Sequence, residues 1–356
     1  MTILLSPGPV PVLEEIAKAQ TKEMITHRSE EFSALYRDLV TRLRGYFNAD
    51  EAYVITGSGA LGLEAIILNL CEKKDRVLCL PNGEFGDKQV ETVKIYADAV
   101  SHRAEDGKGW TLERAREKID SSNASVLAMV YNETSMGVRN PIGEICKYAK
   151  SKGMLTIIDG ISAWPGTELD MKSLHIDAFV TGSQKGIAAP PGMAMIGLSR
   201  DAVSRFTSRD SIPSYYCDLR RHKKRYEKDQ QTPNTPAVSL FWALQKAFDV
   251  LDRRGGLPAC VKRHADAAAY TRKRLTAMGF PLIAEKGFES NTVTGFVCRD
   301  GEQAKAIKSR LAKEYGIKIV GSRGTFKDTG LRIAHMGNFE MANLEKCLDA
   351  IEEIMK

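Results

Sequence analysis

Short hydrophobic runs alternate with amphipathic stretches between about residue 50 and residue 200. The runs are rich in Val, Ile and Leu, as expected for strands that are buried on both faces. This alternation is typical of strands joined by crossover helices in a parallel sheet. It predicts seven strands, at residues 52–56, 76–80, 99–102, 125–131, 155–159, 178–181 and 193–198.

The stretches between these runs carry apolar residues at helical spacing. They predict helices at 61–71, 85–96, 112–119 and 142–152, with Gly153 at the place of a C-terminal glycine stop. Together the elements predict an α/β domain with a seven-stranded, mainly parallel sheet covered by helices. This is the sheet type that binds ligands at the C-terminal ends of its strands.

The pattern changes after the proline-rich segment 232–236. A long helix is predicted at 238–251, followed by a smaller α+β unit with helices at 262–278, 304–314 and 341–356 and strands at 293–298 and 331–334. We therefore predict an N-terminal segment at 1–13, a large domain at 14–250 and a small C-terminal domain at 251–356.

Composition narrows the class of protein. With 356 residues, 43% hydrophobic and 27% charged, the chain has the composition and length of a globular protein with a sizeable core. No apolar run approaches the roughly 20 residues of a membrane span, and Met1–Leu5 lacks the features of a secretory signal. We expect a cytoplasmic protein. Seven scattered cysteines indicate reduced thiols that serve mostly in packing.

The formal net charge is +6, and the only dense basic cluster is the run 220–225. Nucleic-acid binding is one interpretation of such a run. Acids lie close by at Asp218, Glu227 and Asp229, and few aromatic residues interleave. We therefore interpret the run as a solvated helix face or loop and expect no nucleic-acid partner.

Gly57, Gly59 and Gly62 form a G-x-G-x-x-G motif between a predicted strand and a predicted helix. A nicotinamide dinucleotide site also needs an acid at the end of the next strand, but Asp75 lies at the start of that strand. The same turn offers backbone N–H groups at Ser58, Gly59 and Ala60 to a single phosphate. An NAD(P)-binding oxidoreductase and a turn without a ligand remain the alternatives.

Two candidate reactive residues lie at the ends of successive predicted strands. Asp159 ends the strand 155–159, and Lys185 follows the strand 178–181 in a loop of small residues with no charge beside it in the sequence. Such surroundings lower the pKa of an amine and suit it to imine formation. Pyridoxal 5′-phosphate (PLP) needs a lysine, a carboxylate for its ring nitrogen and an anion site for its phosphate. All three are predicted at one edge of one sheet.

The chain resembles fold-type I, class V aminotransferases of the alanine–glyoxylate and serine–pyruvate type, which include archaeal aspartate aminotransferases. The motifs that carry the resemblance are Leu4–Pro9, Thr56–Gly59, Asn132–Val138, Gly182–Lys185 and Leu331–Ile333. They extend over nearly the whole chain, and the Ser-Gln-Lys segment is specific. The resemblance implies a homodimer with shared active sites, to which the N-terminal segment contributes.

The resemblance also implies individual roles. Lys185 is expected to form the internal aldimine and to shuttle the proton, with Asp159 at the pyridine nitrogen and Arg332 at the substrate α-carboxylate. The other implied residues, at the cofactor or the substrate, are Ser58, Gly59, Ala60, Phe85, Thr134, Gln184, Thr235 of the other subunit, and Gly8. No metal is expected.

Two departures from the family pattern stand out. Phe85 occupies the position where a Trp often stacks on the cofactor ring, and Ala60 replaces a His of the animal peroxisomal enzymes. A cysteine desulfurase would place a His before the lysine, whereas Gln184 stands there. That enzyme type and a catalytically silent member of the fold remain weaker alternatives.

The expected reaction is a ping-pong transamination between alanine or serine and glyoxylate or pyruvate, for which one arginine suffices. The alternative is aspartate transamination with 2-oxoglutarate, which needs a second cation. His27–Arg28 and Arg323 are the candidates for that cation, although their sequence context favours a surface or interface role for each.

Overall fold

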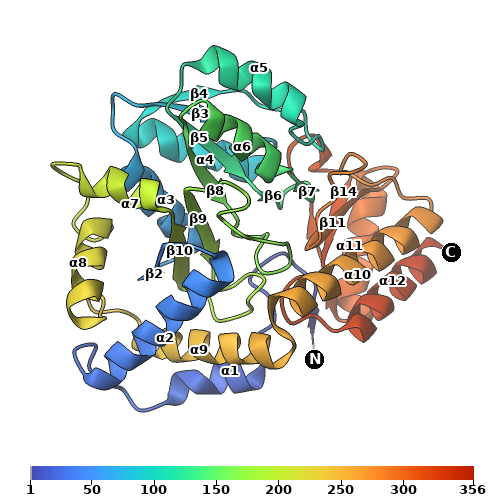
Figure 1. The fold of residues 1–356 in the computed structure, drawn as a ribbon. Helices are drawn as coiled ribbons and strands as arrows, with labels where there is room; N and C mark the ends of the chain where they lie inside the picture. The colour runs from blue at the N-terminus through green and yellow to red at the C-terminus, as the bar shows by residue number, and fades with distance from the viewer. Residues whose placement is uncertain (1) are drawn as a thin grey trace.

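A computed structural model describes residues 2–356 of the chain. Its centre is a seven-stranded sheet of order β2-β10-β9-β8-β5-β3-β4, visible in the middle of Figure 1. The strands are β2 (Glu51–Thr56), β3 (Arg76–Cys79), β4 (Asp98–Ser101), β5 (Val126–Val130), β8 (Leu155–Asp159), β9 (Ala178–Gly182) and β10 (Met193–Leu198). Only β10 runs antiparallel to its neighbours. The predicted mainly parallel sheet is confirmed, and every predicted strand is present.

The alternation of side chains along each strand fills two cores, one on each face of the sheet. In β2, Ala52 and Val54 enter one core, and Tyr53 and Ile55 enter the other. The first core is completed by α2 (Glu30–Phe47), α5 (Leu112–Ser122), α6 (Ile142–Ser151) and α9 (Val238–Arg253). The second is completed by α3 (Gly59–Leu70), α4 (Glu84–Tyr96) and α7 (Arg200–Thr207).

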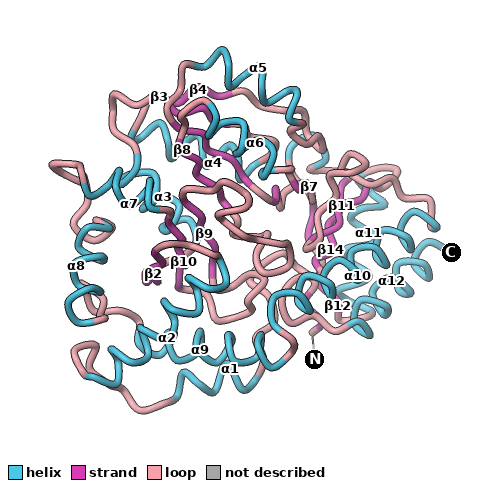
Figure 2. The backbone as a smooth tube through the Cα atoms, in the orientation of Figure 1, coloured by secondary structure: helices cyan, strands magenta, loops and turns pink. Residues whose placement is uncertain are grey.

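A third core belongs to the C-terminal part of the chain. Its elements are α10 (Gly256–Ala277), β11 (Val293–Val297), α11 (Gly301–Glu314), β13 (Val320–Gly321), β14 (Gly330–Ala334) and α12 (Met341–Met355). The strands form an antiparallel sheet of order β11-β14-β13. Figure 2 shows this unit beside the large sheet. The separate core supports the predicted small domain, while the bounds at residues 13 and 250 stay a prediction.

The N-terminal segment packs against the small unit. Strand β1 (Ile3–Leu4) pairs in parallel with β12 (Ile317–Lys318), and Leu5 enters the third core. The chain then continues through the short α1 (Glu14–Lys18), which lies beside α9 in Figure 1. This course carries residues 6–9 past the edge of the large sheet.

Four helices were given no residue range from the sequence: α1, α2, α7 and α8 (Leu219–Asp229). Helix α8 contains the basic run, and only Leu219 and His222 of this helix are buried, so its apolar signal is weak. Its cations pair with nearby acids, for example Lys223 with Glu227 at 2.5 Å. Of the two forms expected for the run, a solvated helix face or a loop, the structure has the helix.

Two further expectations concern the chain as a whole. All seven cysteines are free and buried, which confirms their role as packing thiols. Within residues 2–356, every helix is too short or too polar to cross a membrane.

Candidate active site

Asp159 is the last residue of β8, at the C-terminal edge of the parallel strands. Its side chain is buried, and Oδ1 accepts a 2.8 Å hydrogen bond from the backbone N–H of Ile161. Burial raises the pKa of Asp159 to about 7, against the opposing effects of the Ile161 N–H and of the nearby Lys185 charge. A carboxylate in this position is stabilised by a cationic partner.

Lys185 lies in the loop that follows β9, the neighbouring strand. Its side chain is buried, and Nζ donates a hydrogen bond to the carbonyl of Pro7. Burial lowers the pKa of Lys185 to about 8, with Asp159 acting to raise it and Arg332 to lower it. The sequence neighbours of Lys185 carry no charge, as expected, but Asp159 and Arg332, which are distant in the sequence, place charges near it in the fold. The amine still loses its proton more easily than an exposed lysine.

The N-terminal segment contacts this lysine directly. Gly8 has a φ of +117°, which favours glycine, and a Cβ atom placed on it would lie 2.8 Å from Lys185 Nζ. Gly8 therefore leaves the space that the lysine side chain occupies. The segment reaches the site through its own backbone rather than through a reactive side chain.

The glycine-rich turn lies next to Asp159. Ser58 is the N-cap of α3, so the N–H groups of Gly59 and Ala60 belong to the first, unpaired turn of this helix. A Cβ atom on Gly59 would approach Ile161 to 2.8 Å, which shows how closely the turn meets the loop after β8. The turn thus presents an anion-binding helix N-terminus at the same sheet edge.

Phe85 stands in the first turn of α4, with Lys185 Nζ 5.9 Å from its ring centroid. The position of this turn is fixed by Glu133, whose buried carboxylate accepts N–H bonds from Phe85 at 3.1 Å and Gly86 at 3.0 Å. Glu133 lies in the motif Asn132–Val138, directly after the predicted strand 125–131, but the sequence assigned it no role. An acid at the end of a buried strand was the signal that could have found it.

Thr134 links the loop after β8 to Arg332 in β14. Its hydroxyl donates to Ser162 Oγ at 2.5 Å, and its carbonyl accepts from Arg332 Nη1 at 2.7 Å. Ser162 was also missed by sequence analysis, because a serine in a loop carries no local signal of such a contact.

Arg332 lies in β14 and is 6% exposed. Besides Thr134, the carbonyl of Gly321 accepts from its Nε at 3.0 Å and its Nη2 at 2.7 Å. These bonds fix the plane of the guanidinium while leaving N–H groups free for a carboxylate. Burial lowers the pKa of Arg332 to about 10, so an adjacent anion would relieve the cost of its charge.

A cleft of about 500 Å³ brings several predicted residues together. Five of them line it: Gly8, Phe85, Thr134, Lys185 and Arg332. The other lining residues include the charged side chains Glu84, Lys88, Lys308, Arg323 and Lys327. The cleft lies between the large sheet and the small unit, and its rim is mostly cationic.

Two predicted residues need separate description. The Oε1 atom of Gln184 is buried and accepts no hydrogen bond from residues 2–356, so a ligand donor would satisfy it. Thr235 is exposed and does not line the cleft of its own chain; its hydroxyl is 3.5 Å from His27 Nε2. Arg28 donates to the carbonyls of Thr232 and Pro233 instead of facing the cleft.

The residues present fit PLP. A buried amine of lowered pKa, a buried carboxylate one strand away, an unpaired helix N-terminus and the orphaned Gln184 oxygen correspond to the groups that this cofactor needs. The fold and this site therefore define a PLP-dependent enzyme of fold type I.

The comparisons place the chain within that class. Residues 10–327 match the family model described as aminotransferase class-V, and the chain belongs to this family. An uncharacterized aminotransferase of Methanocaldococcus jannaschii is 36% identical over 94% of this chain and 88% of its own length. The protein is thus a PLP-dependent aminotransferase, which the sequence predicted.

Two solved structures show the same architecture over almost the whole chain. An alanine–glyoxylate aminotransferase from Nostoc sp. has a TM-score of 0.93 and 27% identity, covering 100% of this chain and 95% of that one. A pyridoxamine–pyruvate aminotransferase from Mesorhizobium loti has a TM-score of 0.94 and 26% identity, covering 99% and 91%. The family match and these aminotransferase structures favour an aminotransferase over the NAD(P)-dependent oxidoreductase and the cysteine desulfurase considered from the sequence.

Proposed function

We propose that the enzyme transfers an amino group from alanine or serine to glyoxylate or pyruvate in two half-reactions of a ping-pong cycle. The observation that carries the proposal is the position of Arg332, a buried guanidinium with free N–H groups in the same cleft as Lys185. One such group suffices for a substrate with a single carboxylate. The name of the Nostoc relative, an alanine–glyoxylate aminotransferase, agrees with this choice.

PLP, when bound, supplies an electrophilic aldehyde carbon and a ring that accepts electrons. The residues of the chain hold and orient the reacting groups around it. The N–H groups of Ser58, Gly59 and Ala60 would bind its phosphate, and Asp159 would bind its ring nitrogen. Phe85 would cover one face of the ring.

Lys185 performs the proton transfer. Because burial lowers its pKa to about 8, Nζ is near the pH range in which it can both accept and release a proton. Arg332 holds the substrate α-carboxylate and thereby keeps the α-hydrogen within reach of the amine. Arg332 thus serves substrate binding, and Lys185 serves proton transfer.

The second candidate is a dicarboxylate reaction, aspartate with 2-oxoglutarate. It is favoured by the cleft rim, where Arg323, Lys308 and Lys327 could meet a second carboxylate. Of the two cations proposed from the sequence, Arg323 lines this cleft and Arg28 does not. However, Arg323 already pairs with Glu84 at 3.2 Å and is 61% exposed, which reduces its attraction for a substrate.

Steady-state assays separate the two candidates. We would test alanine, serine, aspartate and glutamate against glyoxylate, pyruvate and 2-oxoglutarate. We expect the highest kcat/KM for alanine or serine with glyoxylate or pyruvate, and a dominant aspartate/2-oxoglutarate activity would reject that assignment. In the second case Arg323→Gln should lower kcat/KM for aspartate about fivefold, while Arg310→Gln, on the exposed face of α11, should not.

We also propose that the enzyme acts as a homodimer with shared active sites. Thr235 supports this, because its exposed hydroxyl lies outside the cleft of its own chain and is free to reach the phosphate site of a partner. Light scattering should report twice the chain mass. Mixing a Lys185→Ala chain with a Thr235→Ala chain should then yield dimers with one unaltered site. A monomer that retains full activity would refute the proposal.

A further inference from the structure

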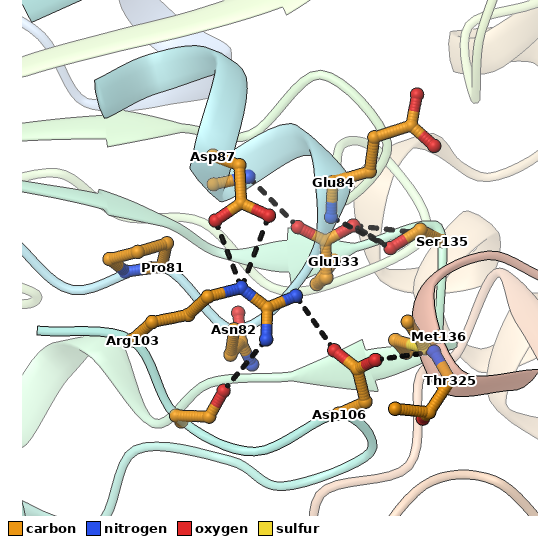
Figure 3. A network of polar contacts seen from close by, with 12 residues as sticks. Pro81, Asn82, Glu84, Asp87, Arg103, Asp106, Glu133, Ser135, Met136 and Thr325 are labelled. Atoms are coloured by element: carbon orange, nitrogen blue, oxygen red, sulfur yellow. Dashed lines mark hydrogen bonds and ion pairs between the residues drawn. The ribbon is translucent and has the colours of Figure 1, made fainter. Parts of the chain in front are cut away.

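A polar network joins the large domain to the small domain next to Arg323 in sequence, a residue that lines the cleft. Arg103, in the loop after β4, donates from Nε to Asp87 at 3.0 Å and from Nη2 to Asp106 at 2.7 Å. Figure 3 shows Arg103 between these two carboxylates, with Thr325 on the far side of Asp106. Oδ2 of Asp106 accepts the backbone N–H of Thr325 at 2.7 Å, across 219 positions of sequence.

The small-domain partner of this network is the turn Gly324–Phe326. Gly324 has a φ of +55°, and a Cβ atom on it would lie 2.2 Å from Asp106 Oδ2. The carboxylate can therefore approach the Thr325 N–H only because residue 324 has no side chain. The contact between Asp106 and Thr325 thus depends on a glycine at position 324, which indicates a specific contact.

Asp106 is well suited to serve as the fixed half of the contact. Its side chain is 5% exposed. The backbone beside it is docked onto the small domain, since the Gly107 carbonyl accepts the Glu285 N–H at 2.8 Å. Burial acts to raise the pKa of Asp106, but the Thr325 N–H and Arg103 outweigh it and the pKa is lowered. The carboxylate is thus kept charged as an acceptor.

The turn leads back along the chain to Arg332. Gly321, three positions before Gly324, is the residue whose carbonyl holds Nε and Nη2 of Arg332. Between them, Ser322 donates from Oγ to the Ser135 carbonyl at 2.8 Å. After Ser322, the polar contacts of residues 323–325 with the large domain that residues 2–356 show are the Arg323–Glu84 ion pair, on an exposed arginine, and the Asp106–Thr325 bond.

We propose that Asp106 is a positioning residue for substrate binding: it holds the segment Gly321–Thr325 and thereby the orientation of Arg332. The proposal rests on the proposed function insofar as Arg332 binds the α-carboxylate. Asp106 touches neither the cofactor nor the substrate site; it acts through the backbone. Arg103 and Asp87 connect the same carboxylate to α4, which carries Phe85. The Asp106 carboxylate is therefore linked both to the helix of Phe85 and to the segment that holds Arg332.

The test uses the holoenzyme and three variants: Asp106→Ala, Asp106→Asn and, as a matched control, Asp98→Ala. Asp98 also accepts from an arginine of the large domain, Arg76 at 3.2 Å, but it lies at the start of β4, and within residues 2–356 its side chain forms no hydrogen bond or ion pair with the small domain. The Asn variant keeps one oxygen that can accept the Thr325 N–H. It should therefore restore part of what the Ala variant loses.

The first readout is independent of activity. Hydrogen exchange of the 322–328 segment should be at least about tenfold faster in Asp106→Ala, unchanged in Asp98→Ala and intermediate in Asp106→Asn. Unchanged exchange in Asp106→Ala would overturn the proposal. This result can be obtained even if the substrate assignment fails, which keeps the two failures distinguishable.

The second readout is a split between KM and kcat for the best amino donor. We expect Asp106→Ala to raise KM about fivefold to tenfold with kcat within about twofold, because Arg332 loses binding that is equal in the ground state and the transition state. Faster exchange with an unchanged KM, or a loss of kcat alone, would overturn the positioning role. A wild type that transaminates none of the donors would instead reject the proposed function.

Discussion

The two sides of the cleft are built differently. On the large-domain side, Asp159 and Lys185 end or follow adjacent strands of one sheet, and each is fixed by its own strand. On the small-domain side, Arg332 is held by carbonyls of Gly321 and Thr134 from separate segments. In the proposed function, the first side supplies the reactive groups and the second binds the substrate. A change on the first side should therefore affect chemistry, and a change on the second should affect affinity.

The largest effect is expected at Lys185. Lys185→Ala should lower turnover by at least about a thousandfold, because in the proposed function its amine forms the imine and transfers the proton. It should also abolish the visible absorbance of the bound cofactor, which a spectrum of the purified protein measures. Lys94→Ala, at the exposed far end of α4, is the control and should keep both. Full turnover in the Lys185 variant would contradict the claim that the large-domain side supplies the reactive amine.

Asp159→Asn should lower kcat by roughly a hundredfold, since an amide cannot stabilise a positive charge on the ring nitrogen as a carboxylate does. Stopped-flow measurement of a single half-reaction isolates this step. Asp177→Asn serves as the control, because Asp177 is another buried acid of the sheet, paired with Lys150 at 3.0 Å away from the site. Equal losses in the two variants would show a structural effect only.

Arg332→Gln should raise KM for the amino donor about thirtyfold, with a smaller change in kcat, because a charged hydrogen bond to the α-carboxylate is lost. Initial rates over a range of donor concentrations give both constants. Arg272→Gln also removes a part-buried small-domain arginine, one that donates to the Ser290 carbonyl at 3.0 Å, and should leave KM unchanged. A kcat effect without a KM effect would contradict the assignment of binding to this side.

A smaller effect is expected from pH. Because burial lowers the pKa of Lys185 to about 8, the amine is mostly protonated below that pH and mostly free above it. The rate at which the apoenzyme takes up PLP covalently should fall roughly eightfold from pH 8.5 to pH 7. Since Asp159 acts to raise this pKa, Asp159→Asn should move the midpoint to lower pH. A rate that keeps rising to pH 10 would indicate an ordinary exposed lysine.

The difference between the two sides of the cleft also decides which features the sequence predicts. The seven strands, Asp159 and Lys185 could be predicted because each signal is local: a buried run, a residue at its end and a loop of small residues. Gly8 was placed at the site by resemblance, and the structure brings it against Lys185.

The contacts that hold the small-domain side are long-range. Arg332 meets the Thr134 carbonyl across 198 positions, and Asp106 meets Thr325 across 219. No spacing or periodicity in one sequence encodes such pairs. Glu133 was missed for the same reason, since its partners are backbone groups at the start of α4. Helix α8 could be predicted only as a helix face or a loop, because its many charged residues leave few buried positions to mark a helix.

The most direct test of the central claim is to locate the cofactor on the chain. Borohydride reduction of the purified enzyme converts a lysine–PLP bond into a stable pyridoxyl-lysine, and peptide mass spectrometry then identifies the modified residue. We predict a single modification, at Lys185, which is lost in Lys185→Ala. Modification of another cleft lysine such as Lys88 or Lys308 in place of Lys185, or no modification of a coloured enzyme, would contradict the account.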